Sequence, residues 1–294
     1  MNAGSGRGDA RRAVDIVREK LAQSGRHFDI FLVEKPAQLA AQAERAAAAA
    51  RAHGGALIGA GGDGTLNAVA REAHAANCPF GVLPQGTFNY FGRAHRIPED
   101  TAAALDVILQ ATPRPTQVGQ LNGSLFLVNA SLGLYPRLLQ EREAYERQFG
   151  RSRLIAMIAS AISLVRDHRA LLLQIERDGQ MQTLFTSTLF VGNNALQLEQ
   201  VGIDEAQQVP GQLAAIAVRP ASRTAMLGLF LRGALGNLGA SDRVDSFAFT
   251  QLSVRPRLPK GRKRIKVAID GEILWFDAPL IFSVAPRPLY LLLP

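Results

Sequence analysis

The sequence predicts an α/β domain followed by a mostly antiparallel β-sandwich. Over the first ~115 residues, short apolar runs alternate with segments of helical periodicity, which indicates a parallel sheet with helices on its faces. Further along, strand-like runs bounded by Gly, Pro, Asn or Asp predominate, as is typical of a sandwich. Because residues 111–119 (ATPRPTQVG) look like a linker, we expect the domains to span residues 1–116 and 117–294.

Each element of the first domain follows from local pattern. Apolar residues recur at helical spacing in 9–23, and the alanine-rich stretch that follows favours a second helix. The expected helices are 9–23, 37–53, 65–75 and 101–110, and the expected strands are 28–33, 56–60 and 80–83. Strands and helices thus alternate along the first domain.

The second domain is expected to be strand-rich with two helices. The helices are expected around residues 136–166 and 222–238. The predicted strands are 124–129, 170–176, 183–191, 213–218, 246–254, 265–269, 273–276 and 280–284. Eight short strands between turn residues favour two packed sheets.

Composition excludes several classes of protein. Of 294 residues, 47% are hydrophobic and 20% charged, which excludes intrinsic disorder. The single cysteine, Cys78, cannot form an internal disulfide, and the five histidines lack zinc-ligand spacing. The longest apolar run, 154–165, is shorter than the ~20 residues of a spanning helix, and no secretory signal is visible. We expect a cytoplasmic protein, with peripheral attachment to the inner membrane face left open.

A net charge of +8 favours an anionic partner. Nucleic acid is not expected, because no zinc-finger, RNP-like or basic coiled-coil pattern occurs. The charge is concentrated in Arg255–Lys266 (RPRLPKGRKRIK), which has seven basic residues and no acidic one. Two interpretations are open, a solvated loop or a surface for anionic lipid.

The strongest local signal is Gly61–Asn67 (GGDGTLN), between a predicted strand and a predicted helix. Glycines let backbone N–H groups approach an anion, and the helix N-terminus favours negative charge. A carboxylate at Asp63 suits such a loop if Mg²⁺ bridges it to phosphates. The alternative is an ordinary turn with Asp63 or Thr65 as the N-cap.

Three further segments bear on this site. The loops Asn2–Gly6 and Gly86–Asn89 are rich in small and polar residues, and loops at the carboxyl ends of parallel strands converge. Neither a P-loop nor a GxGxxG fingerprint occurs. Far downstream, Asp270-Gly271 between apolar runs predicts a hairpin turn, and Glu272 beside it could serve as a general base.

Together these segments resemble the diacylglycerol kinase catalytic-domain family, the bacterial diacylglycerol and sphingosine-kinase-like lipid kinases. Their order along the chain carries the resemblance. The matching stretches are Asn2–Gly6, Gly61–Asn67, Leu83–Asn89 (LPQGTFN), Asn129–Gly133 (NASLG) and Asp270–Glu272. Gly-Gly-Asp-Gly-Thr also occurs in NAD kinases, whereas the complete set with Asp-Gly-Glu is specific to the lipid kinases.

The resemblance implies an ATP- and Mg²⁺-dependent lipid kinase of lipid metabolism. A three-layer α/β domain would bind ATP, a β-sandwich would help bind the lipid, and catalysis would occur in the cleft between them. Asp63 would hold Mg²⁺ and Glu272 would accept the proton of a lipid hydroxyl. The nucleotide would be bound by Asn2, Ser5, Gly6, Gly61, Gly62, Asp63, Gly64, Thr65, Asn67, Thr87 and Asn89. The sequence leaves open the acceptor lipid and the oligomeric state.

The chain departs from the family at several positions. Tyr90 and Gln117 stand where relatives often have Asp, and Pro210-Gly211 stands where some relatives hold a structural Mg²⁺, so we expect that metal site to be absent. These losses would suit a family member that binds lipid or nucleotide without turnover. A soluble nucleotide kinase similar to the NAD kinases is a further alternative.

One expected element has no counterpart in the sequence. The family's first strand precedes the Asn-x-x-Ser-Gly loop, whereas this chain starts at Met1, inside that motif. We therefore expect the natural protein to extend upstream with a short apolar strand that anchors Asn2–Gly6.

Overall fold

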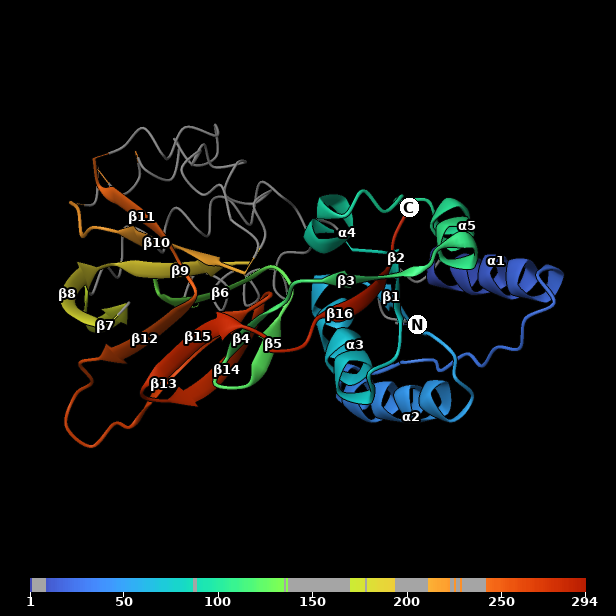
Figure 1. Ribbon diagram of the computed structural model, residues 1–294, viewed down its shortest axis with the longest axis horizontal. Coiled ribbons are helices and arrows are strands. Elements are labelled where there is room, and N and C mark those ends of the chain that lie inside the picture. The colour runs from blue at the N-terminus through green and yellow to red at the C-terminus, as the bar shows by residue number, and fades with distance from the viewer. Residues whose placement is uncertain are drawn as a thin grey trace. The chain divides into compact units, whose positions relative to one another are not determined.

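The computed structural model describes residues 1, 9–86, 89–134, 136, 170–177, 179–193, 211–222, 225, 228 and 242–294. They form two compact units, Met1–Val118 with Pro286–Pro294, and Gly119–Ala285 (Figure 1). The boundary expected at residue 117 lies close to the observed one, at residues 118 and 119. The last nine residues, however, belong to the first unit and not to the second. No helix in the described part of the chain is long and apolar enough to cross a membrane.

The first unit is a four-stranded sheet with helices on both faces. Its strand order is β1 (Leu57–Gly61), β2 (Phe80–Pro84), β16 (Leu289–Leu292) and β3 (Pro113–Thr116). β1 and β2 are parallel, β16 is parallel to β2, and β3 is antiparallel to β16. The helices are α1 (Asp9–Gln23), α2 (Leu39–Ala52), α3 (Asp63–Ala76), α4 (Tyr90–Ala94) and α5 (Thr101–Gln110), with a 3₁₀ turn at Pro36–Gln38.

Two small residues show how the helices cover this sheet. A side chain at Gly59 of β1 would meet Leu66 of α3, about 3.2 Å away. A Cβ atom added at Gly81 of β2 would lie 3.1 Å from the side chain of Ile108 in α5. It would also lie 3.2 Å from the side chain of Ile58, so Ile58 and Ile108 are on the same face of the sheet. Because neighbouring strand residues point to opposite faces, α3 and α5 lie on opposite sides of the sheet.

Two predictions for this unit were wrong. Residues 113–116 are a strand, β3, and not part of a linker, because β16 supplies a partner from the far end of the chain. Residues 28–33 are not a regular strand, and among them Phe31 and Val33 hydrogen-bond to the backbone of Met1. An extended segment becomes a strand only when a neighbour pairs with its backbone.

The second unit consists of two six-stranded sheets. One has the order β5 (Ser124–Phe126), β4 (Gly119–Leu121), β15 (Leu280–Val284), β12 (Gln251–Pro256), β7 (Leu171–Arg177), β8 (Gln180–Thr186). The other has the order β11 (Val244–Phe249), β10 (Leu213–Val218), β9 (Thr188–Gly192), β6 (Asn129–Gly133), β13 (Arg264–Ile269), β14 (Glu272–Asp277).

Side chains from both sheets form one hydrophobic core in the second unit. It includes Phe126, Phe249 and Phe282, all fully buried. Every strand pair within these two sheets is antiparallel. The predicted fold class, an α/β domain and an antiparallel β-sandwich, is confirmed. The helices expected at 136–166 and 222–238 lie almost entirely outside the described residues.

Candidate active site

Two loops at the carboxyl ends of β1 and β2 pack directly against each other. The N–H of Gln85 donates to the carbonyl oxygen of Gly61 over 2.9 Å. A Cβ atom on Gly86 would lie 2.7 Å from the Cα of Gly62, closer than real Cβ atoms come to backbone. The contact therefore requires glycine at 86, for close approach and not for an unusual φ. The structure thus brings together the loops that the sequence placed at neighbouring strand ends.

Asp63 is the first residue of α3, directly after this contact, and its carboxylate reaches the second loop. Oδ1 accepts a hydrogen bond from the backbone N–H of Phe91, 3.2 Å away at the start of α4. Burial raises the pKa of Asp63, and the backbone N–H groups of Phe91, Tyr90, Asp63 and Asn89 partly offset this rise. Asp63 therefore links the two loops through its side chain while its charge is partly desolvated.

Asn89 and Asn67 have buried side chains. Asn89 adopts a left-handed conformation with φ +48°, is 4% exposed, and accepts the N–H of Gly86 on Oδ1 over 2.8 Å. Asn67 lies in α3 and is 3% exposed. Both residues were predicted to contact nucleotide; in the structure the Asn89 side chain holds the second loop through Gly86, and the Asn67 side chain is buried in α3.

The remaining predicted nucleotide residues are the small ones. Gly62, Gly64 and Thr65 are partly exposed around the first turn of the 14-residue helix α3. The backbone N–H groups of a first helical turn form a favourable environment for a phosphate. Four further predicted residues lie outside the described part of the chain, namely Asn2, Ser5, Gly6 and Thr87.

The Asp270-Gly271 pair forms the predicted two-residue hairpin turn, between β13 and β14. Ile269 pairs with Glu272 across the turn, and the φ values of Asp270 and Gly271 are +46° and +88°. Two positive φ values are the mark of the turn type that suits tight hairpins. Glu272 is exposed directly after the turn, with no hydrogen-bond or ion-pair partner among the described residues.

Asp270 has a second role that the sequence did not reveal. It is 7% exposed, and its carboxylate accepts three backbone N–H groups, from Leu127 (2.7 Å), Val128 (2.9 Å) and Asn129 (2.8 Å). Charge-assisted bonds of this kind are stronger than neutral ones. Because the partners lie more than 140 residues away, no local pattern could have identified them. The hairpin that carries Glu272 is thereby fixed to the start of β6.

Two of the positions at which the chain departs from the family it resembles lie in described parts of the fold. Tyr90 opens α4, and Gln117 lies between β3 and β4. Pro210 lies outside the described residues, and Gly211 forms a turn with φ +90°. Among the residues that the structure describes, no group of three or more His, Cys, Asp or Glu could hold a metal ion by itself.

Comparison with known proteins supports the resemblance seen in the motifs. Residues 1–121 match the family model of the diacylglycerol kinase catalytic domain. Nearly all of the matched residues lie in the first unit. Diacylglycerol kinases of Staphylococcus aureus strains RF122 / ET3-1 and JH9 are each 32% identical over 185 residues, which is 61% of this chain and 56% of theirs. The chain thus matches just over half the length of these curated relatives.

Solved structures extend the similarity of fold to the whole chain. A diacylglycerol kinase of Bacillus anthracis str. Sterne covers 100% of this chain and 94% of its own, with a TM-score of 0.69 and 16% identity. A second structure from the same organism gives a TM-score of 0.74 at 18% identity, covering 100% of this chain and 95% of its own. At such identities the match establishes a shared fold.

Proposed function

We propose that this protein is a lipid kinase that transfers the γ-phosphoryl group of ATP to a lipid hydroxyl in a Mg²⁺-dependent reaction. The observation that carries the proposal is the contact between the Gly61–Thr65 and Gly86–Asn89 loops at the N-terminus of α3, inside the matched catalytic domain. Diacylglycerol kinases among the relatives support a lipid alcohol as the acceptor.

The first unit would bind the nucleotide mainly through its backbone. N–H groups in the first turn of α3, from Gly62 to Thr65, would point at the phosphates, where the helix dipole also favours negative charge. Asn89 would act indirectly, because its Oδ1 holds the N–H of Gly86 and so fixes the second loop. Asn67, also predicted to contact nucleotide, is buried in the same helix, four residues after Asp63.

Asp63 would hold Mg²⁺ together with the phosphates. The residues present fit this metal, since Mg²⁺ in such sites commonly takes one or two carboxylates and completes its shell with phosphate oxygens and water. A partly buried carboxylate whose pKa is raised gains from a nearby dication, which favours the ionised form. When bound, Mg²⁺ would neutralise charge on the transferred phosphoryl group.

Glu272 would accept the proton of the lipid hydroxyl. As the acceptor oxygen forms its bond to the γ-phosphorus, the bond from that phosphorus to the β–γ bridging oxygen breaks and ADP leaves. The hydroxyl proton passes to the Glu272 carboxylate, which is exposed and so open to a ligand. Asp270 would position Glu272, since its bonds to residues 127–129 hold the hairpin.

The experiment that tests this function is transfer of labelled phosphate from ATP to vesicles containing diacylglycerol, a sphingoid base, phosphatidylglycerol or an isoprenoid alcohol. Wild type should label at least one lipid only when Mg²⁺ is present. Glu272→Gln should lower turnover about 10²–10⁴-fold with nearly unchanged ATP affinity. Asp277→Asn, an exposed carboxylate on the same strand, is the matched control and should keep full activity.

The same assay separates the alternatives. If the protein binds ATP or lipid without turnover, wild type and the Glu272→Gln variant should consume ATP at the same low rate. Such a result would favour the non-catalytic hypothesis that the residues Tyr90, Gln117 and Pro210 suggest. Labelling of NAD in place of every lipid would identify a soluble nucleotide kinase.

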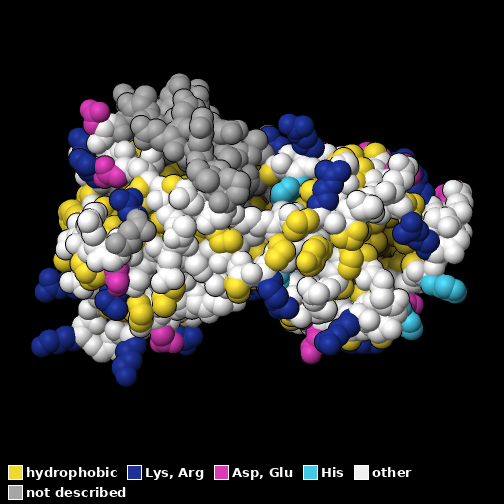
Figure 2. All heavy atoms as spheres, in the orientation of Figure 1, with side chains coloured by type: hydrophobic (Ala, Val, Ile, Leu, Met, Phe, Trp, Pro, Cys, Tyr) yellow, Lys and Arg dark blue, Asp and Glu magenta, His cyan; other side chains and the backbone are white. Residues whose placement is uncertain are grey.

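We further propose that Arg255–Lys266 orients the enzyme on an anionic membrane. Six of its seven basic residues are exposed at the β12–β13 connection, and Figure 2 shows Lys and Arg side chains projecting there. Lys266 lies over the ring of Trp275, 5.2 Å from its centroid, and Trp275 is 50% exposed. A tryptophan beside basic residues suits the membrane–water interface, and sequence reasoning missed its contribution.

Co-sedimentation with phosphatidylglycerol vesicles tests this surface. Binding should fall steeply between low and high salt, because exposed charges are screened. Neutralising Arg262, Lys263 and Arg264 together should weaken binding by roughly 1 kcal/mol per residue, whereas neutralising Arg12, Arg18 and Lys35 on the first unit should not. Equal effects of the two triple variants would show that only net charge matters.

A further inference from the structure

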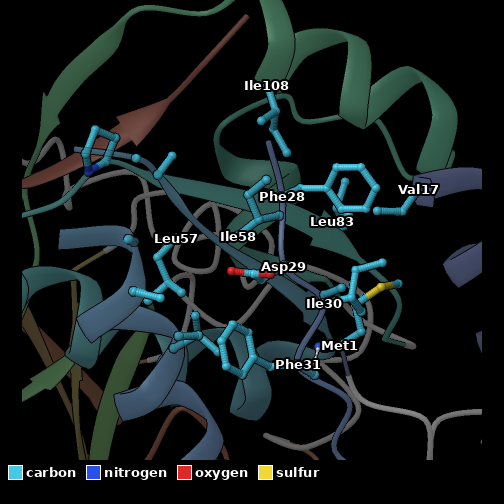
Figure 3. Close-up of a pocket in the computed structure, with 18 of the residues that line it drawn as sticks. Met1, Val17, Phe28, Asp29, Ile30, Phe31, Leu57, Ile58, Leu83 and Ile108 are labelled. Carbon is cyan, nitrogen blue, oxygen red and sulfur yellow. Dashed lines mark hydrogen bonds between the residues drawn. The ribbon is translucent and has the colours of Figure 1, made fainter. Parts of the chain in front are cut away.

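Apolar surface is open in both units, in different forms. In the first unit it lines a cavity of about 980 Å³, which is bordered by Phe28–Phe31 and by residues of β1 (Figure 3). In the second unit it lies on β8, the last strand at one edge of a sheet (Figure 1). The cavity lies among elements of a single unit, whereas the edge of β8 can meet another molecule.

β8 lacks the features that usually discourage pairing at the edge of a sheet. Such edges are commonly kept short, charged or interrupted by proline. Among the described residues, the second unit has three other edges: β5 has only three residues, β11 carries Asp245, and β14 carries Glu272 and Asp277. β8 extends over seven residues, Gln180–Thr186, without a charged residue or a proline. It is therefore the edge best suited to accept another strand.

Three residues of β8 direct their backbone groups away from the sheet. On the neighbouring strand β7, the carbonyl oxygen of Leu172 accepts the N–H of Arg257, directly after β12, over 2.8 Å. Leu172 thus points its backbone toward β12 and away from β8. Residues opposite each other in an antiparallel pair point either both toward or both away from one another. Phe185 is opposite Leu172, so its N–H and C=O face the free edge, as do those of Met181 and Thr183 at alternate positions.

The side chains of the same three residues lie on the outer face of the sheet. Leu184, between them in sequence, packs against the core on the other face. Met181 and Phe185 are 53% and 57% exposed, the largest values among the described bulky hydrophobic side chains. A bilayer could bury these side chains but would leave the outward N–H and C=O groups without partners, whereas another strand satisfies both.

We propose that two copies of this chain form a dimer by pairing their β8 strands antiparallel about a two-fold axis at Thr183. This pairing places Met181 of each copy opposite Phe185 of the other, and Thr183 opposite Thr183. Because all three residues direct their backbone to the free edge, each of their N–H groups would meet a carbonyl oxygen of the other copy. Contacts between sulfur and an aromatic ring and between two threonines stabilise such cross-strand pairs.

The placement of charge favours a second copy as the partner. β8 itself is uncharged, and Glu176 and Arg177 of β7 lie beside the turn that leads into β8. In the antiparallel arrangement, the turn end of one β8 meets the far end of the other, where Leu171 and Leu172 lie on β7. Like charges of the two copies are thereby kept apart. A strongly charged partner would find no opposite charge on β8.

The dimer would join two six-stranded sheets into one sheet that continues across the axis. A two-fold interface of this kind is closed, since both edges are used and no open edge of β8 remains for a third copy. The pairing does not depend on the proposed function, because neither β7 nor β8 supplies a residue to the candidate active site.

Charge substitution at the axis tests the inference. Thr183 is exposed, so Thr183→Lys and Thr183→Glu should each fold with nearly unchanged Tm, yet each places like charges opposite one another across the axis. A single strand pair is a small interface, so we expect a dissociation constant in the range of about 1–100 μM. In sedimentation velocity, wild type should shift to twice the monomer mass as its concentration passes through this range. Each variant should raise the dissociation constant at least tenfold, and an equimolar mixture of the two variants should recover the dimer.

Gln174→Lys is the matched control. Gln174 is an exposed residue opposite Thr183 on β7, one strand further from the axis. In the dimer the two introduced lysines would be three strand spacings apart, about 14 Å, which exceeds the Debye length of about 8 Å at physiological salt. The control should therefore dimerise as wild type does.

Hydrogen exchange locates the interface independently. Above the dissociation constant, exchange at the N–H groups of Met181, Thr183 and Phe185 should slow at least fivefold relative to dilute protein. A wild type that stays monomeric at all these concentrations would overturn the inference. So would a dimer that the Thr183 variants weaken no more than Gln174→Lys does, or a mixture of the Lys and Glu variants that fails to recover the dimer.

Discussion

Asp63 is subject to two opposing influences. Burial disfavours its charged form, while backbone N–H groups of residues 89–91 favour it, and the net effect raises the pKa. A folded-state pKa above the unfolded value means that ionisation of Asp63 costs folding free energy. This cost is absent below the unfolded pKa and present in full above the folded one, including at neutral pH. A charge kept at a cost in stability is typical of a functional site.

The first prediction concerns the variant Asp63→Asn. An amide oxygen can still accept the N–H of Phe91, and no charge needs desolvation, so Tm should stay the same or rise. Mg²⁺-dependent ATP binding should weaken at least tenfold, because the amide is a poor ligand for the metal. Thermal melts with and without Mg-ATP measure both effects. A variant that melts lower and binds ATP normally would show that Asp63 serves the fold alone.

The second prediction concerns His95, which follows α4 and meets the ring of Phe91 with centroids 4.7 Å apart. Burial lowers the pKa of His95 to about 4. The unfolded chain therefore binds the proton more readily, so stability is present above about pH 6.5 and lost as the pH falls toward 4. A shift of this size corresponds to roughly 3 kcal/mol at most.

Urea unfolding at pH 7, 5.5 and 4 checks this expectation. His95→Gln should reduce the loss of stability between pH 7 and 4, and His53→Gln, at an exposed position, should not. The same pH dependence in all three proteins would mean that carboxylates, and not His95, cause the acid sensitivity.

At the scale of elements, the site depends on how closely two loops approach. The Cα of Gly62 would lie 2.7 Å from a Cβ at position 86, and Asn89 Oδ1 would lie 2.9 Å from it. Neither is the end of a flexible side chain that could move aside easily, since one is backbone and the other is hydrogen-bonded to the N–H of Gly86. The loops must therefore separate if residue 86 carries a side chain.

The third prediction is that Gly86→Ala damages nucleotide binding. We expect ATP affinity to fall at least tenfold and stability to fall by about 1–3 kcal/mol from overpacking. Gly55→Ala is the matched control, because an added Cβ there would meet only ordinary contacts at 3.8 Å or more. Isothermal titration with ATP and urea melts measure the two quantities. Equal behaviour of the two variants would contradict the close loop contact.

At the scale of the molecule, the two units depend on a chain that leaves the first and returns to it. β16 lies between β2 and β3, and its residues Leu289 and Leu291 are buried. Without β16, β3 loses its partner in the sheet and β2 gains an open edge.

The fourth prediction is that a chain ending at residue 285 loses the fold of the first unit. Limited proteolysis should then cleave within residues 9–118 while the second unit stays protected. A chain ending at residue 292 retains all of β16 and should resist cleavage as the full chain does. If the first unit of the 285-residue chain stays intact and binds ATP, the role given to β16 is wrong.

Much of the architecture could be predicted from local pattern. Helical periodicity located α1 and α5 to the residue, and the alternation of strand and helix identified the α/β unit. Glycine-rich motifs placed the loops after β1 and β2, and Asp-Gly located the β13–β14 turn. These features depend on neighbours within a few residues, which periodicity and turn chemistry report directly.

Other features are set by contacts between residues far apart in the chain. Residues 113–116 form a strand only because β16 returns to pair with them, whereas in residues 28–33 only the bonds of Phe31 and Val33 to Met1 pair the backbone, as far as the chain is described. Only the tertiary structure shows that the Asp270 carboxylate accepts hydrogen bonds from the backbone N–H groups of residues 127–129. The same holds for the hydrogen bond from the N–H of Gly86 to the side chain of Asn89. The sequence by itself determined α1, α5, the Asp270-Gly271 turn and the positions of the motifs, but it did not predict α4. Only the tertiary structure decided which strands pair and which polar side chains hold the backbone, because a hydrogen bond depends on distance in space and not on separation along the chain.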